Sequence, residues 1–204
     1  MRQKNGVFME LSELKLCIDT ALDSCQKTIK EKPIVVWSEA DLERLLANCI
    51  IKSICEVSNN SQEPEFTVHT QISHYVDGKK HPDIRPDILL LKEKDLIKAI
   101  DNYIPYKKEK YEGPSIAIEL KYLHVGDGIS VVEHDFTKWE SKLDDNTWLY
   151  VVVLLDVPRN PRNRNYYADK EAKIYQQRDA MRKKFPSDSN RIYSKVLKKI
   201  VDKK

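Results

Sequence analysis

Residues 115–123 of the chain read Ser-Ile-Ala-Ile-Glu-Leu-Lys-Tyr-Leu, an apolar run that two charged residues interrupt. Successive side chains of a strand point to opposite faces, so Glu119 and Lys121 share one face and the two isoleucines share the other. Burying a charge is costly unless the charge is paired or meets a metal ion. The run therefore predicts a buried strand that holds a functional carboxylate and a functional lysine.

The sequence on either side predicts further strands. Residues 66–72 alternate apolar and polar side chains, which is typical of a half-buried strand. After a turn at Asp77-Gly78, the apolar run 88–91 predicts a second strand that forms a hairpin with the first. Residues 148–155 are almost continuously apolar, as expected for a strand that is covered on both faces.

Apolar residues at helical spacing predict helices around these strands. The first helix covers residues 9–30 and ends before Pro33. A second helix begins at the N-cap Ser38, with Glu39 and Asp41 in its first turn. Later in the chain, helical patterns occupy residues 132–144, 168–185 and 191–201.

The order of these elements predicts an α/β protein with a central mixed β-sheet flanked by helices. A length of 204 residues suits one domain with a sizeable core. We expect that domain to have three parts, namely an N-terminal helix (1–32), a core (38–156) and basic C-terminal helices (157–204).

Charge is unevenly distributed along the chain. Residues 1–157 hold 20 Lys and Arg against 27 Asp and Glu, a net charge of −7. Residues 158–204 hold the other 15 Lys and Arg against 5 acidic residues, a net charge of +10. A basic segment suits a polyanionic partner such as nucleic acid, although basic chain ends are often only solvated.

Composition and motifs argue against several classes of protein. The chain is 41% hydrophobic and 33% charged, which excludes collagen-like and wholly disordered chains. It has neither a membrane-spanning apolar run nor a signal-like N-terminus, so we expect a cytoplasmic protein with no membrane partner. The cysteines lack CxxC spacing and predict reduced, buried thiols. No HExxH, GxxxxGK[ST] or GxGxxG motif indicates a zinc hydrolase, a nucleotide-driven motor or a dinucleotide enzyme.

A third charged residue is expected beside the first two. Asp87 opens the strand at 88–91 directly after Pro86, and hairpin-type pairing would bring its carboxylate next to Glu119. Two carboxylates and the Lys121 ammonium could bind a hard divalent cation and hold a water molecule beside it. The alternative interpretation is a turn aspartate next to the exposed charges of an edge strand.

These residues resemble the PD-(D/E)xK motif of the restriction-endonuclease-like nuclease superfamily, with Pro86-Asp87 as its first part and Glu119-Leu120-Lys121 as its second. Glu39, at the start of a leucine-rich helix, is similar to the glutamate in the first helix of the superfamily's Holliday-junction resolvases. The run Asp135-Phe136-Thr137-Lys138-Trp139 resembles the Asp- and Lys-bearing helix that follows the Glu-x-Lys strand in many members. The resemblance covers roughly residues 38–156 and implies a restriction-endonuclease-like core.

The resemblance implies a role for each matching residue. Asp87 and Glu119 would ligate Mg²⁺, or Mn²⁺ in its place, together with the carbonyl oxygen of Leu120. Glu39 would bind the ion directly or through water, and Lys121 would orient and help deprotonate the attacking water or stabilise the developing negative charge.

Three further residues and one segment are candidates for the expected site. Lys138 would contact a phosphate, and Arg85 could do the same or pair with an acidic neighbour. Glu43 competes with Glu39, because it lies one turn later on a similar face of the helix. Residues 93–113 form an insertion relative to the simplest members and are a candidate specificity element.

The sequence therefore predicts a metal-dependent nuclease that hydrolyses phosphodiester bonds, with DNA favoured over RNA as the substrate. The main rival is a catalytically inactive module on the same fold that binds nucleic acid or a protein. A homodimer is one possible assembly, because two active sites would be needed to cut both strands of a duplex. The N-terminal helix is a candidate interface for such a dimer.

Overall fold

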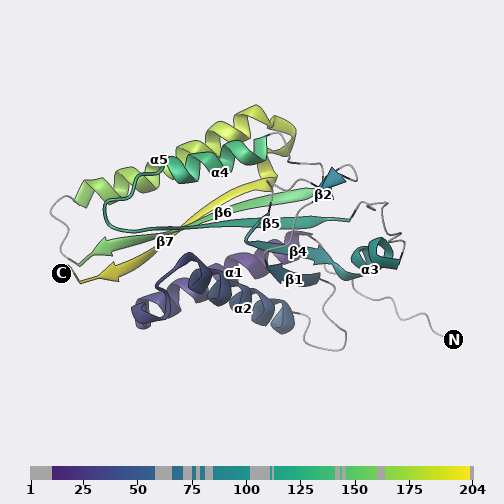
Figure 1. Cartoon of the computed structure of the whole chain (residues 1–204), viewed down its shortest axis with the longest axis horizontal. Coiled ribbons are helices and arrows are strands. Elements are labelled where there is room, and N and C mark those ends of the chain that lie inside the picture. Colours follow the sequence, from purple (N-terminus) through teal and green to yellow (C-terminus); the bar gives the residue numbers. More distant parts are fainter. Residues whose placement is uncertain are drawn as a thin grey trace.

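A five-stranded mixed sheet with helices on both faces organises the computed structural model (Figure 1). The predicted α/β class with a central mixed sheet is thus confirmed. The structure describes residues 11–57, 66–70, 75–76, 79–80, 85–101, 111, 113–140, 143, 146–159 and 164–202.

The strands follow the spatial order β1-β4-β5-β6-β7. The first three pair antiparallel, whereas β5, β6 and β7 run parallel. Their bounds are Phe66–Thr70, Ile88–Lys92, Ser115–Leu123, Thr147–Pro158 and Ile192–Val201. A separate two-stranded ribbon joins β2 (Tyr75–Val76) to β3 (Lys79–Lys80), and the predicted turn at Asp77-Gly78 lies outside the described residues.

Two helical layers cover the sheet. In Figure 1, α1 (Leu11–Glu31) and α2 (Glu39–Val57) lie below it, and α4 (Ser130–Glu140) and α5 (Arg164–Lys184) lie above it. Because both faces are covered, the inner strand β6 is apolar and buried along nearly its whole length. The remaining helical elements are α3 (Glu93–Asp101), η1 (Pro33–Val35) and η2 (Pro186–Arg191).

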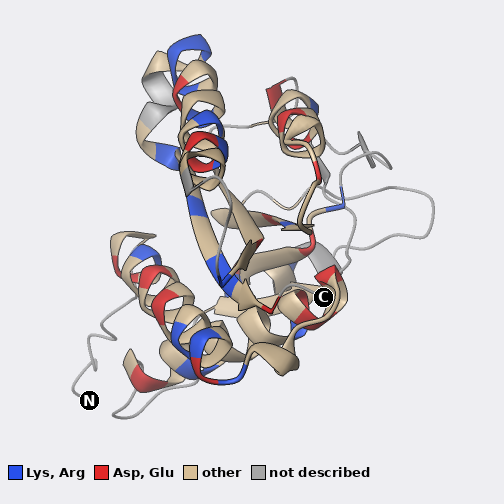
Figure 2. Cartoon of the chain, turned by 90° about the vertical axis from the view of Figure 1, so that its left-hand side faces the viewer, with Lys and Arg blue, Asp and Glu red and all other residues tan. Residues whose placement is uncertain are grey.

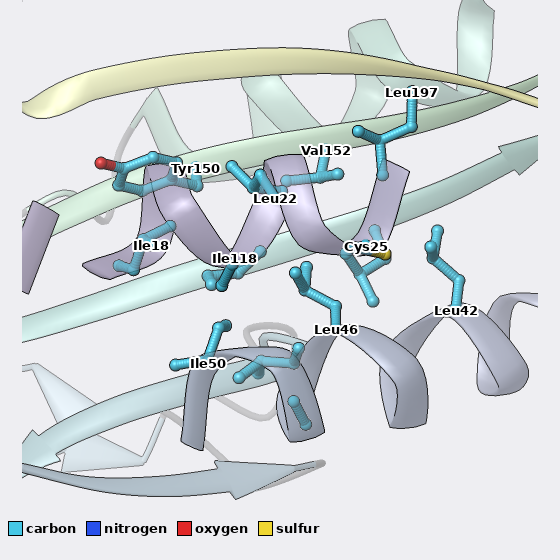
Figure 3. Packing of buried hydrophobic residues seen from close by; sticks show 14 of the residues in the cluster. Ile18, Leu22, Cys25, Leu42, Leu46, Ile50, Ile118, Tyr150, Val152 and Leu197 are labelled. Carbon is cyan, nitrogen blue, oxygen red and sulfur yellow. The ribbon is translucent and has the colours of Figure 1, made fainter. Parts of the chain in front are cut away.

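The larger of two cores lies between α1, α2 and the sheet (Figure 3). Leu22 of α1 and Leu46 of α2 are fully buried there against Ile118 and Val152 of the sheet. The apolar face of α1 is therefore used inside the fold, although the sequence also suggested this helix as a dimer interface. The second core packs α4 and α5 on the opposite face of the sheet.

Leu22→Ala is expected to lower the free energy of unfolding by about 2–4 kcal/mol, because it leaves a cavity in the larger core. Urea denaturation followed by circular dichroism measures the change. Leu16→Ala is the matched control, since Leu16 lies on the same helix with 64% of its surface exposed and should change stability by less than about 0.5 kcal/mol. Equal effects of the two substitutions would contradict this packing of α1.

The prediction of a second C-terminal helix is wrong. Residues 192–201 form β7, which pairs parallel to β6 and closes that side of the sheet. Ile192, Val196 and Ile200 recur every four residues, so their spacing suits a helix as well as a strand. Their β-branched side chains favour the strand, and the edge of β6 supplies a partner for its backbone. The basic helix predicted at 168–185 is confirmed as part of α5.

Basic residues of the C-terminal segment pair with acidic residues of the rest of the chain. Lys195 of β7 lies 3.0 Å from Asp23 of α1, and Lys184 of α5 lies 2.6 Å from Glu140 of α4. In the ribbon of Figure 2, positions of basic residues (blue) and of acidic residues (red) alternate along the helices. The uneven charge along the sequence is thus partly balanced within the fold.

Two smaller expectations are also resolved. All four cysteines are free, and Cys17 and Cys25 are buried, but Cys55 is exposed, so the prediction of buried thiols is wrong for that residue. Among the described residues, no helix is both long enough and apolar enough to span a membrane.

Candidate active site

The candidate site lies where β5 extends beyond β4. Strand β4 pairs with β5 only from Ser115 to Ile118, whereas β5 continues to Leu123. Beyond the paired part of β5, carboxylates accept the backbone hydrogen bonds in place of a neighbouring strand. Asp87 Oδ2 accepts one from the Leu120 N–H at 2.6 Å, and Glu39 Oε2 accepts one from the Tyr122 N–H at 3.3 Å. The side chains thus occupy the backbone edge that a longer β4 would have covered.

Local sequence places Glu39 at this edge. Ser38 caps α2, because its Oγ accepts the Asp41 N–H at 3.2 Å while Asp41 Oδ2 accepts the Ser38 N–H at 3.1 Å. The predicted N-cap is confirmed, and Glu39 is the first residue of the helix that follows it. Its contacts with β5 make it the helix acid that meets the strand, and Glu43 lies one turn further along α2.

Lys121 lies among four carboxylates. Its Nζ is 3.4 Å from Glu39 Oε1 and 3.5 Å from Asp135 Oδ2. Burial by itself lowers the pKa of Lys121, but Asp135, Glu39, Asp87 and Glu119 outweigh that effect, so the pKa is raised above its usual value. Lys121 is therefore held as an ammonium ion at neutral pH.

Glu119 is almost fully buried, and its Oε1 binds two donors from α4. Lys138 Nζ lies 3.0 Å away, and Trp139 Nε1 donates a hydrogen bond at 2.8 Å. Burial raises the pKa of Glu119 to about 7, because Lys138 and Trp139 only partly offset the loss of water and Asp87 adds a like charge. The site thus holds a carboxyl group that titrates near neutral pH.

Asp135 is a member of the site that the sequence analysis named only as part of a helical run, without a role of its own. Its side chain is buried, and although Oδ2 lies at ion-pair distance from Lys121, it makes no aligned hydrogen bond among the described residues. Burial raises the pKa of Asp135 to about 6, against the opposing effects of Lys121 and Lys138. The spacing of Asp135, Lys138 and Trp139 places them on one face of the helix, and this signal could have pointed to Asp135.

The remaining predicted residues have these positions. Lys138 pairs with Glu119, so a phosphate would have to compete with that carboxylate. Arg85 is exposed two residues before Asp87. Asp87 precedes the first residue of β4, whereas α3 begins directly after the last one. The described start of the insertion predicted at 93–113 therefore lies at the far end of β4 from the site.

The charge at the site fits a divalent cation. Four carboxylates meet two ammonium groups, those of Lys121 and Lys138, so full ionisation leaves a surplus of two negative charges. Carboxylate and carbonyl oxygens are the ligands that Mg²⁺ prefers, and the Leu120 carbonyl points to the same open edge as its N–H. In the described part of the chain, no three His, Cys, Asp or Glu side chains form a ready ligand set. The expected ligands are two carboxylates and a backbone carbonyl.

The stability of the metal-free protein is expected to fall as pH rises from about 4.5 to about 7. The folded state holds the Glu119 proton more tightly than the unfolded state does, so this stabilisation is lost as Glu119 ionises. Glu119→Gln should weaken the pH dependence by on the order of 2–3 kcal/mol over this window. Urea titrations in EDTA at a series of pH values measure the effect, and parallel curves for variant and wild type would contradict it.

Comparison with known proteins gives no match to a family model, to a curated protein or to a solved structure.

Proposed function

We propose that the chain is a metal-dependent nuclease that hydrolyses phosphodiester bonds of DNA. The observation that carries the proposal is the meeting of Asp87, Glu119, Lys121 and Glu39 at the open edge of β5. These are the residues in which the sequence resembles the PD-(D/E)xK superfamily, and they come from three separate elements of the fold. The free thiols suit a cytoplasmic enzyme.

A phosphodiester is an anion, so its attack by hydroxide needs positive charge nearby. Asp87, Glu119 and the Leu120 carbonyl would hold Mg²⁺, or Mn²⁺, and the bound ion would supply Lewis acidity and a more acidic water. Because its pKa is raised, Lys121 would act as a hydrogen-bond donor. It would orient the attacking water or stabilise the negative charge that develops on the phosphate oxygens.

Cofactor binding and proton release should be coupled in such an enzyme. A carboxyl group must lose its proton to ligate a metal ion, and the pKa of Glu119 is about 7. At limiting Mg²⁺, cleavage is therefore expected to increase from pH 6 to pH 8. Initial rates at several Mg²⁺ concentrations across this pH range measure the effect. Rates that do not depend on pH at limiting Mg²⁺ would argue against Glu119 as a ligand.

The rival function is a binding module without catalysis. The observation that favours it is the engagement of Glu119 Oε1 by both Lys138 and Trp139, since a metal ion would have to share that carboxylate. A pure binder needs no response to Mg²⁺, but its contacts with phosphates would still make binding sensitive to salt.

The deciding experiment incubates the purified protein with supercoiled plasmid and with labelled single-stranded DNA and RNA, in Mg²⁺, Mn²⁺ or EDTA. The nuclease proposal expects cleavage that needs the metal and that co-elutes with the protein in gel filtration. Salt-sensitive binding without cleavage in either metal would instead support the binding module.

A further inference from the structure

An exposed tryptophan lies beside the candidate active site. Trp37 has 67% of its surface exposed and precedes Glu39 by two residues. Its backbone is held in place, because the Trp37 N–H donates a hydrogen bond to Asp41 Oδ2 at 3.0 Å as part of the cap of α2. A large aromatic ring is thus presented to solvent on a fixed support.

A buried lysine lies against this ring. Lys199 of β7 is only 5% exposed, and its Nζ is 5.0 Å from the centre of the Trp37 ring. The same Nζ donates hydrogen bonds to the Val36 carbonyl at 2.5 Å and to the Tyr122 hydroxyl at 2.6 Å. The cation–π contact and these hydrogen bonds hold the indole and the ammonium together.

A second exposed ring shares this support. The Tyr122 hydroxyl donates a hydrogen bond to Asp156 Oδ1 at 2.7 Å, and Asp156 Oδ2 lies 3.0 Å from Nδ1 of His124. The His124 side chain is 57% exposed, and its ring centre is 4.4 Å from that of Tyr122. Buried groups of three adjacent strands therefore support two solvent-facing rings, those of Trp37 and His124.

We propose that Trp37 and His124 form a stacking platform for an unpaired nucleobase, so that the preferred substrate is single-stranded at or next to the cut. Tryptophan and histidine rings stack on exposed bases, whereas a continuous duplex hides the faces of its bases. The Lys199 ammonium is buried and lies 4.0 Å from Asp156 Oδ1, so it supports the Trp37 ring from below and does not itself contact the nucleic acid. This inference rests on the proposed nuclease function. The two sites are adjacent, because Glu39 of the candidate active site accepts a hydrogen bond from the N–H of Tyr122, whose ring lies beside His124.

Binding measured in EDTA tests the platform without cleavage. The probe is a fluorescein-labelled 12-nucleotide dT strand, alone or paired with dA, and the readout is Kd by fluorescence anisotropy. Trp37→Ala is expected to weaken binding of the single strand by roughly tenfold or more, and His124→Ala should also weaken it. Trp37→Phe should retain most of the affinity, because phenylalanine also stacks. Val131→Ala is the matched control, since Val131 is exposed on α4, on the other face of the sheet, and should leave Kd unchanged.

Two outcomes would overturn the platform. One is an unchanged Kd for the single strand in Trp37→Ala. The other is a wild-type dimer in sedimentation that Trp37→Ala makes monomeric, which would assign the exposed Ile34 and Trp37 to an interface between copies. The nuclease proposal is tested separately. If the protein binds dT through Trp37 but does not cleave in Mg²⁺, the stacking platform is supported and the nuclease function is contradicted.

Discussion

Asp87→Asn is expected to lower Mg²⁺-dependent cleavage by on the order of 10³-fold or more and to leave the fold intact. Asparagine has nearly the same shape as aspartate, and its Oδ1 can still accept the hydrogen bond from the Leu120 N–H. The edge of β5 is therefore preserved, and only the negative charge that would hold the metal ion is lost. Because Asp87 also raises the pKa of Glu119, the variant should lower that pKa as well.

Initial cleavage rates and thermal unfolding of the same preparations measure these two effects. The matched control is Asp23→Asn, since Asp23 is an exposed residue of α1 that pairs with Lys195 on the sheet edge. The control should cleave at the wild-type rate. Full activity in Asp87→Asn would remove this residue from the mechanism, and a large fall in melting temperature would show that Asp87 serves mainly to fasten β5.

Trp139→Ala is expected to lower the free energy of unfolding by about 3–5 kcal/mol. The Trp139 side chain is fully buried in the second core, and its Nε1–H is one of the two donors to Glu119. The substitution removes a large apolar volume and takes one of the two α4 donors from the buried carboxylate, which keeps its contact with Lys138. Urea denaturation at pH 8, where Glu119 is largely ionised, should show the greatest loss.

Trp139→Phe separates the two contributions to this loss. Phenylalanine keeps most of the ring packing but lacks the indole N–H, so we expect a cost of about 1–3 kcal/mol from the unmade hydrogen bond together with the lost volume. This cost should shrink at pH 5, where Glu119 is protonated. If both variants remain as stable as the wild type at pH 8, Trp139 does not support the site as described.

The strand that bears the site was the most predictable part of the chain. Period two alone places Ile116 and Ile118 on the face of β5 opposite to Glu119 and Lys121, and the structure buries both isoleucines in the larger core. The position of Asp87 followed from the hairpin-type pairing expected between its strand and the strand of Glu119, and β4 does pair antiparallel with β5. The local sequence pattern was enough to predict these positions, because the alternation within a single strand determines which face of the sheet a side chain occupies.

Contacts between distant elements were not predictable in the same way. The role of Asp135 depends on how α4 packs over β5, and a helix pattern does not state which strand residue each turn will meet. The pairing of Lys138 with Glu119 has the same origin. For β7, a spacing that suits two kinds of element was decided by the free edge of β6, which is a property of the whole sheet.

The contact between α1 and β7 bears on how the chain folds. Gln26 of α1 exchanges side-chain hydrogen bonds with the backbone of Lys198 in β7, which is 172 residues away in the sequence. Pairing segments so far apart in the sequence is slow, because the entropy cost of closing the intervening loop comes before the gain in contact energy that offsets it. Until β7 is in place, the edge of β6 and the part of α1 that β7 covers would both be open to other chains during synthesis. We expect refolding to be slow and aggregation to increase with protein concentration, even though the finished sheet is well covered.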